Sequence, residues 1–294
     1  MKSAASVKLR PTPDIDTSGP GVPDRNSVVE VRRRGPSARV VAPLGVLAAM
    51  FGAWSFVSHV ILDPDRRFLL PPPESVVLHG LLDGGQLAEM LGALVSTAEV
   101  ALVGLGISIV VGVAVGVLMS QARWVEYSIY PYAIVLQTIP ILAVVPLLGY
   151  WFGFDFESRV IVCVLVSLFP LITNTLYGLQ SVDAGHHDLF TLMRASRRQR
   201  FMHLQLPAAL PAIITGCKIS AGLAVIGSIV ADFFFRQGDP GIGRLIDIYR
   251  QRLATEQLMT ALFLSSLLGL LLFAVFEVLG RVVDRRRGVL KADV

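Results

Sequence analysis

The sequence is short of charge and nearly free of cysteine. Charged residues make up 16% of its 294 residues, against about 25% in an average soluble domain. The only two cysteines, Cys163 and Cys217, both lie in apolar runs. We therefore expect two small core residues rather than a disulfide framework or a metal cluster. With 53% hydrophobic residues and a mean hydropathy of +0.64, the composition excludes an ordinary soluble domain and indicates a membrane protein.

A nucleotide-binding loop of the form G-x-x-x-x-G-K-[ST] is also missing. The glycines of "GDPGIGRL" lack the Lys-Ser/Thr pair and predict a turn. His186 and His187 have no further metal ligands nearby, and no nucleophile or general base stands out. We expect neither ATP hydrolysis nor metal chemistry from this chain, and nothing points to nucleic acid as a partner.

Long apolar runs are abundant. The first runs from Val40 to Leu62, about 23 residues, where the apolar core of a signal peptide has about 7–15, so it predicts an uncleaved anchor. A helix needs about 20 apolar residues to cross a membrane. Because the third of the later runs contains Pro131, Pro140 and Pro146, it predicts a kinked or broken span buried among the others. We predict an all-α membrane protein with six transmembrane helices, the later five at 95–119, 127–152, 160–179, 212–235 and 258–283.

Basic residues are spread unevenly between these runs, which predicts the orientation. The tail up to Arg39 has eight Lys and Arg against four acids, and the segment around Arg194 has four against two. The segment 63–89 has two against five. We predict that both termini are cytoplasmic, in a chain divided into a disordered tail 1–38, a first span 39–62, an extracytoplasmic lead-in 63–94, a five-helix core 95–287 with a cytoplasmic loop at 186–207, and a tail 288–294.

The cytoplasmic loop carries the densest pattern, "DLFTLMRASRRQRFMHLQLPAALPA" from Asp188 onward. Asp188 is a candidate N-cap for a short helix, and Leu189, Leu192 and Met193 give that helix one apolar face. Pro207 suits the first turn of the next helix. Arginines here could serve only to fix the topology, but topology alone requires no amphipathic helix followed by Leu-Pro.

The loop, with "LPPPESVV", "LQTIPILAVVPLLGYWFGF", "LFPLITNTLYGLQSVD" and "GDPGIGRLI", resembles permeases of ABC importers. The branch is the nitrate/sulfonate/taurine one, including thiamine-pyrimidine-precursor and riboflavin-type members. The resemblance covers about 69–287 and implies the MetI-like fold of type I importers. It further implies a permease in the bacterial inner membrane, a non-enzymatic transport subunit for a small organic nutrient, such as a sulfonate- or nitrate-like anion or a vitamin precursor.

The resemblance implies that the loop is a coupling helix that docks on a cytoplasmic ABC ATPase dimer, which binds the ATP and Mg. Two positions depart from the family pattern, since Glu-Ala-Ala is Asp188-Leu189-Phe190 here and the usual glycine is Arg194. Further implied partners are a second permease subunit, identical or a close paralogue, and an extracytoplasmic substrate-binding protein. The expected coupling residues are Asp188, Leu189, Phe190, Leu192, Met193, Arg194, Ala195, Ser196, Arg197, Arg198, Leu206 and Pro207.

Polar residues within the apolar runs are candidates for the translocation path, because such residues tend to face a bundle interior or a water-filled route. Gln137, Thr138, Thr173 and Asn174 lie beside prolines in the third and fourth runs. Hydrogen bonding between helices is an equally good explanation for them. Lys218 and Glu277 are more simply explained by the inner membrane surface. We expect Gly104, Gly106, Gly112 and Gly116 to allow close helix packing.

The last outer loop, 232–256, contains "RLIDIYRQR", which predicts a short amphipathic helix. The resemblance places this loop on the side that receives the binding protein, with Arg236, Arg244, Asp247 and Arg250 as candidate docking residues. An ion-coupled secondary carrier is the alternative function. It is disfavoured by the structured cytoplasmic loop and by the lack of a detectable inverted repeat.

Overall fold

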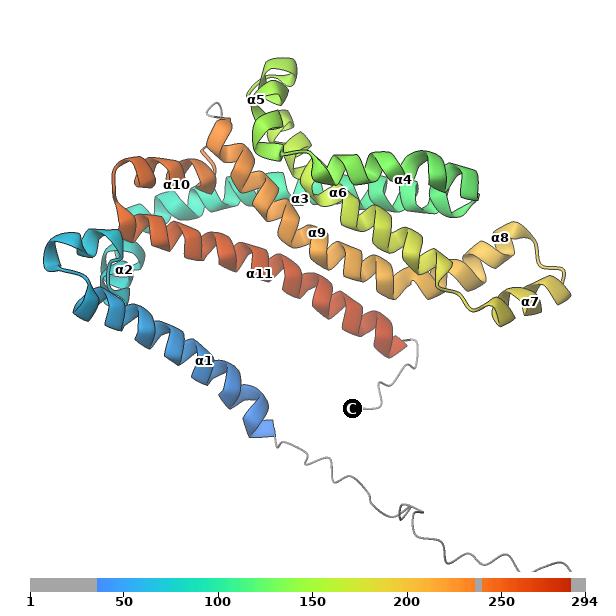
Figure 1. The fold of residues 1–294 in the computed structure, drawn as a ribbon, viewed down its shortest axis with the longest axis horizontal. Coiled ribbons are helices and arrows are strands. Elements are labelled where there is room, and N and C mark those ends of the chain that lie inside the picture. Colours follow the sequence, from blue (N-terminus) through green and yellow to red (C-terminus); the bar gives the residue numbers. More distant parts are fainter. Residues whose placement is uncertain (1–35, 236–239, 287–294) are drawn as a thin grey trace, which may run out of the picture. The chain divides into compact units, whose positions relative to one another are not determined.

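The computed structural model describes residues 36–235 and 240–286. Every regular element in these ranges is a helix. The predicted tails therefore lie largely outside the described residues, although α1 already begins at Pro36. The described residues up to 50 belong to one compact unit and those from 51 onward to another, larger one (Figure 1). The helices are α1 (Pro36–Phe56), α2 (Pro73–Val76), α3 (Gly84–Ser120), α4 (Arg123–Thr138), α5 (Ile141–Phe152), α6 (Phe156–Gln180), α7 (Ala184–Leu192), α8 (Arg197–Arg200), α9 (Leu206–Phe234), α10 (Ile242–Gln251) and α11 (Thr255–Arg286).

Five helical segments in the described residues are long and apolar enough to cross a membrane. Short π-helical turns extend two of them, so that one runs from Val41 to Ile61 and another from Arg197 to Phe234. The pair α4 and α5 provides a sixth if it counts as one broken span. The all-helical, multi-span architecture expected from composition is confirmed.

The centre of the larger unit is α6, which packs against both α3 and α9. Glycines on one face of α3 permit the contact: a Cβ at Gly112 would lie 2.6 Å from Cβ of Leu171, and one at Gly116 would lie 2.7 Å from Cβ of Thr175. Gly106 has open space around it, so the packing role predicted for it is wrong. It stands two residues after Gly104 and therefore points about 200° away from that face.

The third predicted span is broken as its prolines indicated. Ile139 and Pro140 interrupt it, and the axes of α4 and α5 differ by 99°. The expectation that this span is buried among the others is wrong for the single chain. Side chains along its outer side are largely exposed, including Tyr132, Tyr150 and Trp151.

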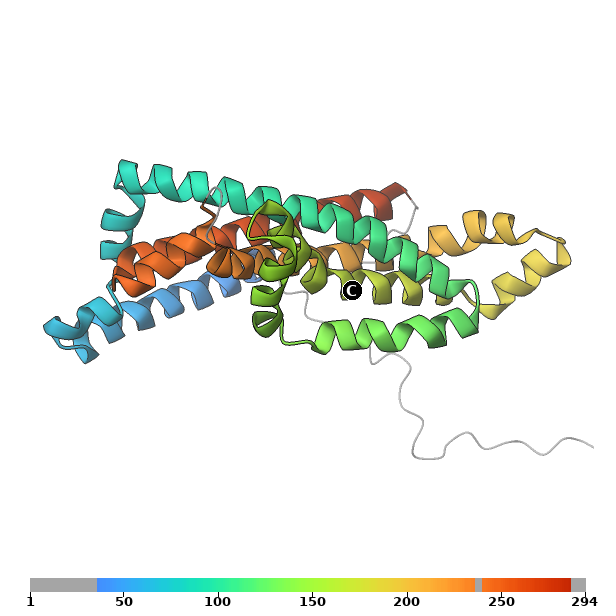
Figure 2. The same ribbon diagram turned by 90° about the horizontal axis from the view of Figure 1, so that it is seen from above.

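The ends of the bundle carry different elements. Figures 1 and 2 show α7 and α8 at one end, together with the turn between α3 and α4. The same views place α2 and α10 at the other end. We call these the α7 end and the α10 end.

Candidate functional site

The segment predicted to couple to an ATPase forms two short helices between α6 and α9. The N-cap of α7 is Asp183, whose carboxylate accepts a hydrogen bond from the Gly185 N–H at 2.8 Å. Asp188 lies inside α7 and is exposed, so the N-cap role predicted for it is wrong. The helix begins five residues earlier than residue type suggested, because Ala184–Asp188 are already helical.

A Schellman motif ends α7. The Ala195 N–H donates to the Phe190 carbonyl and the Arg194 N–H donates to the Thr191 carbonyl, each at 3.0 Å. Arg194 occupies the left-handed position of the motif, with φ of 50°. Glycine is the usual residue there because it has no Cβ to clash. The position where the family carries glycine therefore does have the backbone that favours glycine, although an arginine occupies it here.

The connection into α8 is fixed by side chains. Ser196 and Gln199 form a reciprocal capping box at the start of α8. The Arg200 guanidinium donates to Oγ1 of Thr191 at 2.8 Å, which ties α8 back to α7. The loop is thus hydrogen-bonded along its whole length.

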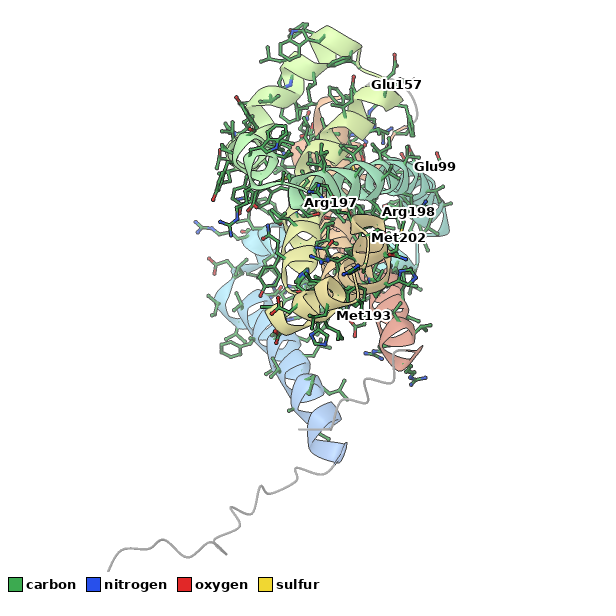
Figure 3. All side chains as sticks on the ribbon, turned by 90° about the vertical axis from the view of Figure 1, so that its right-hand side faces the viewer. Glu99, Glu157, Met193, Arg197, Arg198 and Met202 are labelled. Carbon is green, nitrogen blue, oxygen red and sulfur yellow. The ribbon has the colours of Figure 1, made fainter. Side chains whose placement is uncertain are left out.

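Four large apolar side chains of this loop are exposed. The exposed fractions are 51% for Leu189, 82% for Leu192, 69% for Met193 and 47% for Met202. We call these four residues the loop patch. Figure 3 looks onto the α7 end and shows Met193 and Met202 there with Arg197 and Arg198.

The remaining predicted coupling residues fall into two groups. Arg194, Ser196, Arg197 and Arg198 are exposed around the loop patch, whereas Phe190 and Ala195 are half-buried. Leu206 and Pro207 are also half-buried, because they lie at the start of α9 after a π-helical turn, Phe201–Gln205. The wider turn accommodates Pro207, which has no N–H to donate.

A polar cavity of about 600 Å³ opens beside the loop. It is lined from the turn between α3 and α4 by Arg123 and Glu126, and from the other side by Gln180 and His187. The Gln180 side chain donates to Glu126 at 2.9 Å. Arg123 and Glu126, whose connection the charge pattern alone left unassigned, therefore lie at the α7 end.

The predicted path residues do not form one cluster. Gln137 lines a second cavity of about 350 Å³ beside the break between α4 and α5. Thr138 is exposed and bonds to the Val135 carbonyl of its own helix. Thr173 and Asn174 bond to the carbonyls of Phe169 and Pro170 at 3.0 and 2.8 Å, also within one helix. Only Gln137 of the four is among the residues that line this cavity.

Charged side chains in the spanning helices are mostly paired. Lys218 of α9 pairs with Glu277 of α11, which also accepts from Arg281 at 3.1 Å. Glu99 lies on the exposed side of α3 (Figure 3). Arg159 of α6 and Asp232 of α9 form a buried ion pair. Nothing in the sequence indicated that Arg159 and Asp232 pair.

The predicted outer amphipathic helix is α10. Its apolar face, including Leu245, Ile246 and Tyr249, is buried against α3 and α11. Burial, together with the nearby Glu89 carboxylate, raises the pKa of the Tyr249 phenol.

The candidate docking residues differ in exposure. Asp247 is 8% exposed and accepts hydrogen bonds from Arg250 at 2.7 Å and Gln251 at 2.6 Å. Arg250 itself is exposed, Arg244 is half-buried, and Arg236 lies outside the described residues.

No group of three or more His, Cys, Asp or Glu side chains that could hold a metal ion occurs within residues 36–235 and 240–286. The sites of interest are therefore two surfaces and a cavity: the loop patch, the outer side of α10, and the space beside Gln137.

Comparison with known proteins assigns the chain to a family. The family model described as "Binding-protein-dependent transport system inner membrane component" matches residues 108–289. The chain is 33% identical over 236 residues to the formylaminopyrimidine transport permease protein ThiX of Halalkalibacterium halodurans, covering 78% of this chain and 89% of ThiX. It is 30% identical over 216 residues to the putative aliphatic sulfonates transport permease protein SsuC of Bacillus subtilis, covering 72% and 76% of the two chains.

A solved structure shares the fold. A chain of the MetNI methionine ABC transporter, in inward facing conformations, aligns with a TM-score of 0.60 at 18% identity. The alignment covers 68% of this chain and 99% of that one. The helical arrangement is thus that of a MetI-like permease.

Proposed function

This chain belongs to the family of binding-protein-dependent transport system inner membrane components, and from that premise we propose that its α7–α8 loop is the docking element for a cytoplasmic ATPase dimer. The chain is a multi-pass permease of the ABC importer type, in the nitrate, sulfonate and thiamine-precursor branch. On this proposal ATP and Mg bind to the partner ATPase, and the permease converts ATPase closure into alternating access. Both termini lie in the cytoplasm.

The observation that carries the proposal is the loop patch. Its four apolar side chains are exposed on a backbone that is capped at both ends, closed by a Schellman motif and tied by Arg200. Such a preorganised surface loses little conformational entropy on binding. Exposed arginines around it would steer an acidic partner groove.

Affinity purification in mild detergent tests this proposal. The tagged permease should retain an ATPase subunit, identified by mass spectrometry, and the Leu192→Asp/Met193→Asp variant should lose it. The matched control is Leu69→Asp/Leu82→Asp, which adds the same charges at exposed apolar positions of the segment predicted to be extracytoplasmic. Retention of the ATPase by the loop variant would refute the docking role, and absence of any ATPase from the unmutated protein would favour an ion-coupled carrier.

We further propose that two identical permease subunits pack through the α4–α5 region. Pro140 and Pro146 leave backbone carbonyls without their helical donors, and irregular backbone at membrane depth is tolerated only beside protein or a water-filled path. The exposed Gln137 lies at the same break. A second subunit would cover these groups and complete the path.

Cysteine cross-linking tests this pairing in a background with Cys163→Ala and Cys217→Ala. Tyr150→Cys should give a cross-linked dimer of the permease, whereas Leu270→Cys on α11, similarly exposed, should not. A cross-linked product that contains a different permease would replace the homodimer with a heterodimer of paralogues.

For the cargo we propose a small organic nutrient, with an uncharged vitamin precursor of the formylaminopyrimidine kind ahead of a sulfonate- or nitrate-like anion. Support comes from the similarity to ThiX and from the cavity beside Gln137, whose other lining residues are all apolar. An anion crossing this space would find no cationic partner among the lining residues. Uptake of labelled formylaminopyrimidine, competed by excess ethanesulfonate or nitrate, separates the two classes: inhibition by these anions would reverse the order.

A further inference from the structure

The first turn of α10 is capped from outside its own segment. Its N-cap residue, Gly241, offers no side chain. Instead, the Ile242 N–H donates to Oγ1 of Thr97 at 2.8 Å, and the Gly243 N–H points to the Asp232 carboxylate at 3.3 Å. Thr97 and Asp232 are themselves 2.7 Å apart. A carboxylate at a helix N-terminus is favoured by the free N–H groups and by the helix dipole.

The same carboxylate joins α10 to a third spanning helix. Arg159 of α6 forms an ion pair with Asp232, and both side chains are almost fully buried, at 4% and 0% exposure. The Arg159 guanidinium also lies 3.4 Å from Oγ of Ser96 on α3. Side chains from α3, α6 and α9 thus converge on the N-terminus of α10. We call Thr97, Arg159 and Asp232 the cap triad.

Two glycines make this approach possible. A Cβ at Gly241 would collide with the Asp232 carboxylate. A Cβ at Gly243 would collide with the Ile229 carbonyl and would lie 2.7 Å from Cβ of Asp232. The glycines of "GDPGIGRL" therefore do more than form a turn, because they bring backbone donors within reach of a buried carboxylate.

The remainder of α10 is held in place by apolar packing. Its apolar face packs on Met90 and Ala93 of α3 and on Ala261 and Leu264 of α11. Its exposed side carries Arg250. A partner that binds this exposed side and shifts α10 would therefore also shift α6 and α9, which the buried Arg159–Asp232 pair joins.

We infer that the cap triad consists of positioning residues that fix α10 to the outer ends of α3, α6 and α9, so that a substrate-binding protein docked on α10 acts directly on these spans. This inference rests on the proposed function. Without the cap, α10 keeps its apolar packing but its N-terminus loosens, and docking no longer moves the spans. The α7 end is untouched, so the basal ATP hydrolysis of the complex persists while its stimulation by the binding protein is lost.

Two double variants distinguish the hydrogen-bond acceptor that caps α10 from the buried ion pair as such. Arg159→Met with Asp232→Asn removes both charges but leaves an amide oxygen to accept from α10. Arg159→Met with Asp232→Leu removes both charges and the acceptor. Neither leaves a lone buried charge, which by itself would destabilise the protein. Thr97→Ser and Thr97→Val form a second matched pair, in which only serine keeps the hydroxyl.

The experiment uses the complete transporter in nanodiscs, with the binding protein added as the probe. Basal and stimulated ATP hydrolysis are measured alongside hydrogen exchange of residues 242–251. We expect the Ser variant to resemble the unmutated transporter, and the Asn variant, which keeps the acceptor for α10 but loses the ion pair to α6, to keep part of the stimulation. In the Leu and Val variants stimulation should fall by about fivefold or more, the lower end of typical coupling factors, and exchange in α10 should accelerate by roughly fivefold, as loss of a hydrogen bond predicts.

The outcomes are distinguishable. Equal stimulation by the Asn and Leu variants at equal assembly would overturn the positioning role, as would faster exchange in α10 with unchanged stimulation. A complex of the unmutated permease that hydrolyses no ATP would instead overturn the proposed function on which the inference rests.

Discussion

The helices α7 and α10 resemble each other in construction but differ in what covers them. Both are short and closed by a Schellman motif, with a non-glycine residue in the left-handed position, Arg194 for α7 and Leu253 for α10. The apolar face of α10 is buried within its own chain, whereas Leu192 of α7 and its C-cap residue Met193 are exposed. Helix α10 is complete within the single chain, whereas α7 lies beside apolar side chains that the described residues leave exposed.

The largest expected effect is the difference in stability between a variant with an aspartate introduced on α10 and one with an aspartate introduced on α7. Leu245→Asp places an unpaired charge in the buried face of α10 and should destabilise the protein by about 3–5 kcal/mol. Leu192→Asp should change stability by less than about 0.5 kcal/mol, because the side chain is already exposed. Thermal unfolding of each variant in the same detergent measures the difference. Similar losses for both variants would mean that α7 is packed in the isolated permease.

A smaller effect is expected at the two left-handed positions. A residue with a Cβ at a left-handed position lowers the free energy of unfolding by about 1–2 kcal/mol through steric strain. Replacing it with glycine removes this strain, but glycine loses more chain entropy on folding, which offsets about 0.5–1 kcal/mol of the gain. Leu253→Gly should therefore raise the stability by about 0.5 kcal/mol.

Arg194→Gly should leave global stability unchanged, since α7 contributes little buried surface, but should slow hydrogen exchange in residues 190–196.

Exchange in that segment that is faster in Arg194→Gly than in the unmutated protein would show that the arginine side chain, rather than its backbone, orders the loop. Leu253→Ala is the control for lost side-chain packing at the α10 end, because it shortens the side chain without relieving the backbone.

The smallest effect concerns the exposed side of α10. Arg250→Gln removes an exposed guanidinium from the largely buried Asp247, which keeps its hydrogen bond from Gln251, and should cost less than about 0.5 kcal/mol of stability. The same change should slow association of the binding protein, and should do so more at low salt than at high salt. Surface plasmon resonance at two salt concentrations checks this, and a salt-independent loss would place Arg250 outside the docking surface.

Composition alone predicted the class of fold because spanning a membrane sets strict demands on helix length and polarity. The break in the third span followed from Pro140, whose effect on the backbone is local. The α7–α8 loop was located for the same reason, from short-range signals of apolar spacing and proline. Its first turn was misplaced because Asp183 and Asp188 are equally good caps by residue type.

Features that depend on distant segments were not predictable from one sequence. The role of Gly106 was misjudged because the sequence shows a stripe of glycines but not which side of α3 meets α6. Arg159 lies near the start of α6 and Asp232 near the end of α9. They are far apart in the sequence, so no local pattern indicates that they form a pair. The exposure of Gln137 likewise depends on the axis bend between α4 and α5, since a proline marks a kink without fixing its angle.

The helix that runs without interruption from Arg197 to Phe234 has a mechanical consequence. It begins in the loop that carries the patch at the α7 end and finishes two residues after Asp232, so a helical path of about 57 Å connects the two surfaces. Tilting α9 alone, which is about 44 Å long, by about 10° around its middle displaces each of its ends by about 4 Å, in opposite directions. The π-helical turn at Phe201–Gln205 is the joint nearest the inner tip, and stiffening or loosening it would set how much of a push at one membrane face arrives at the other.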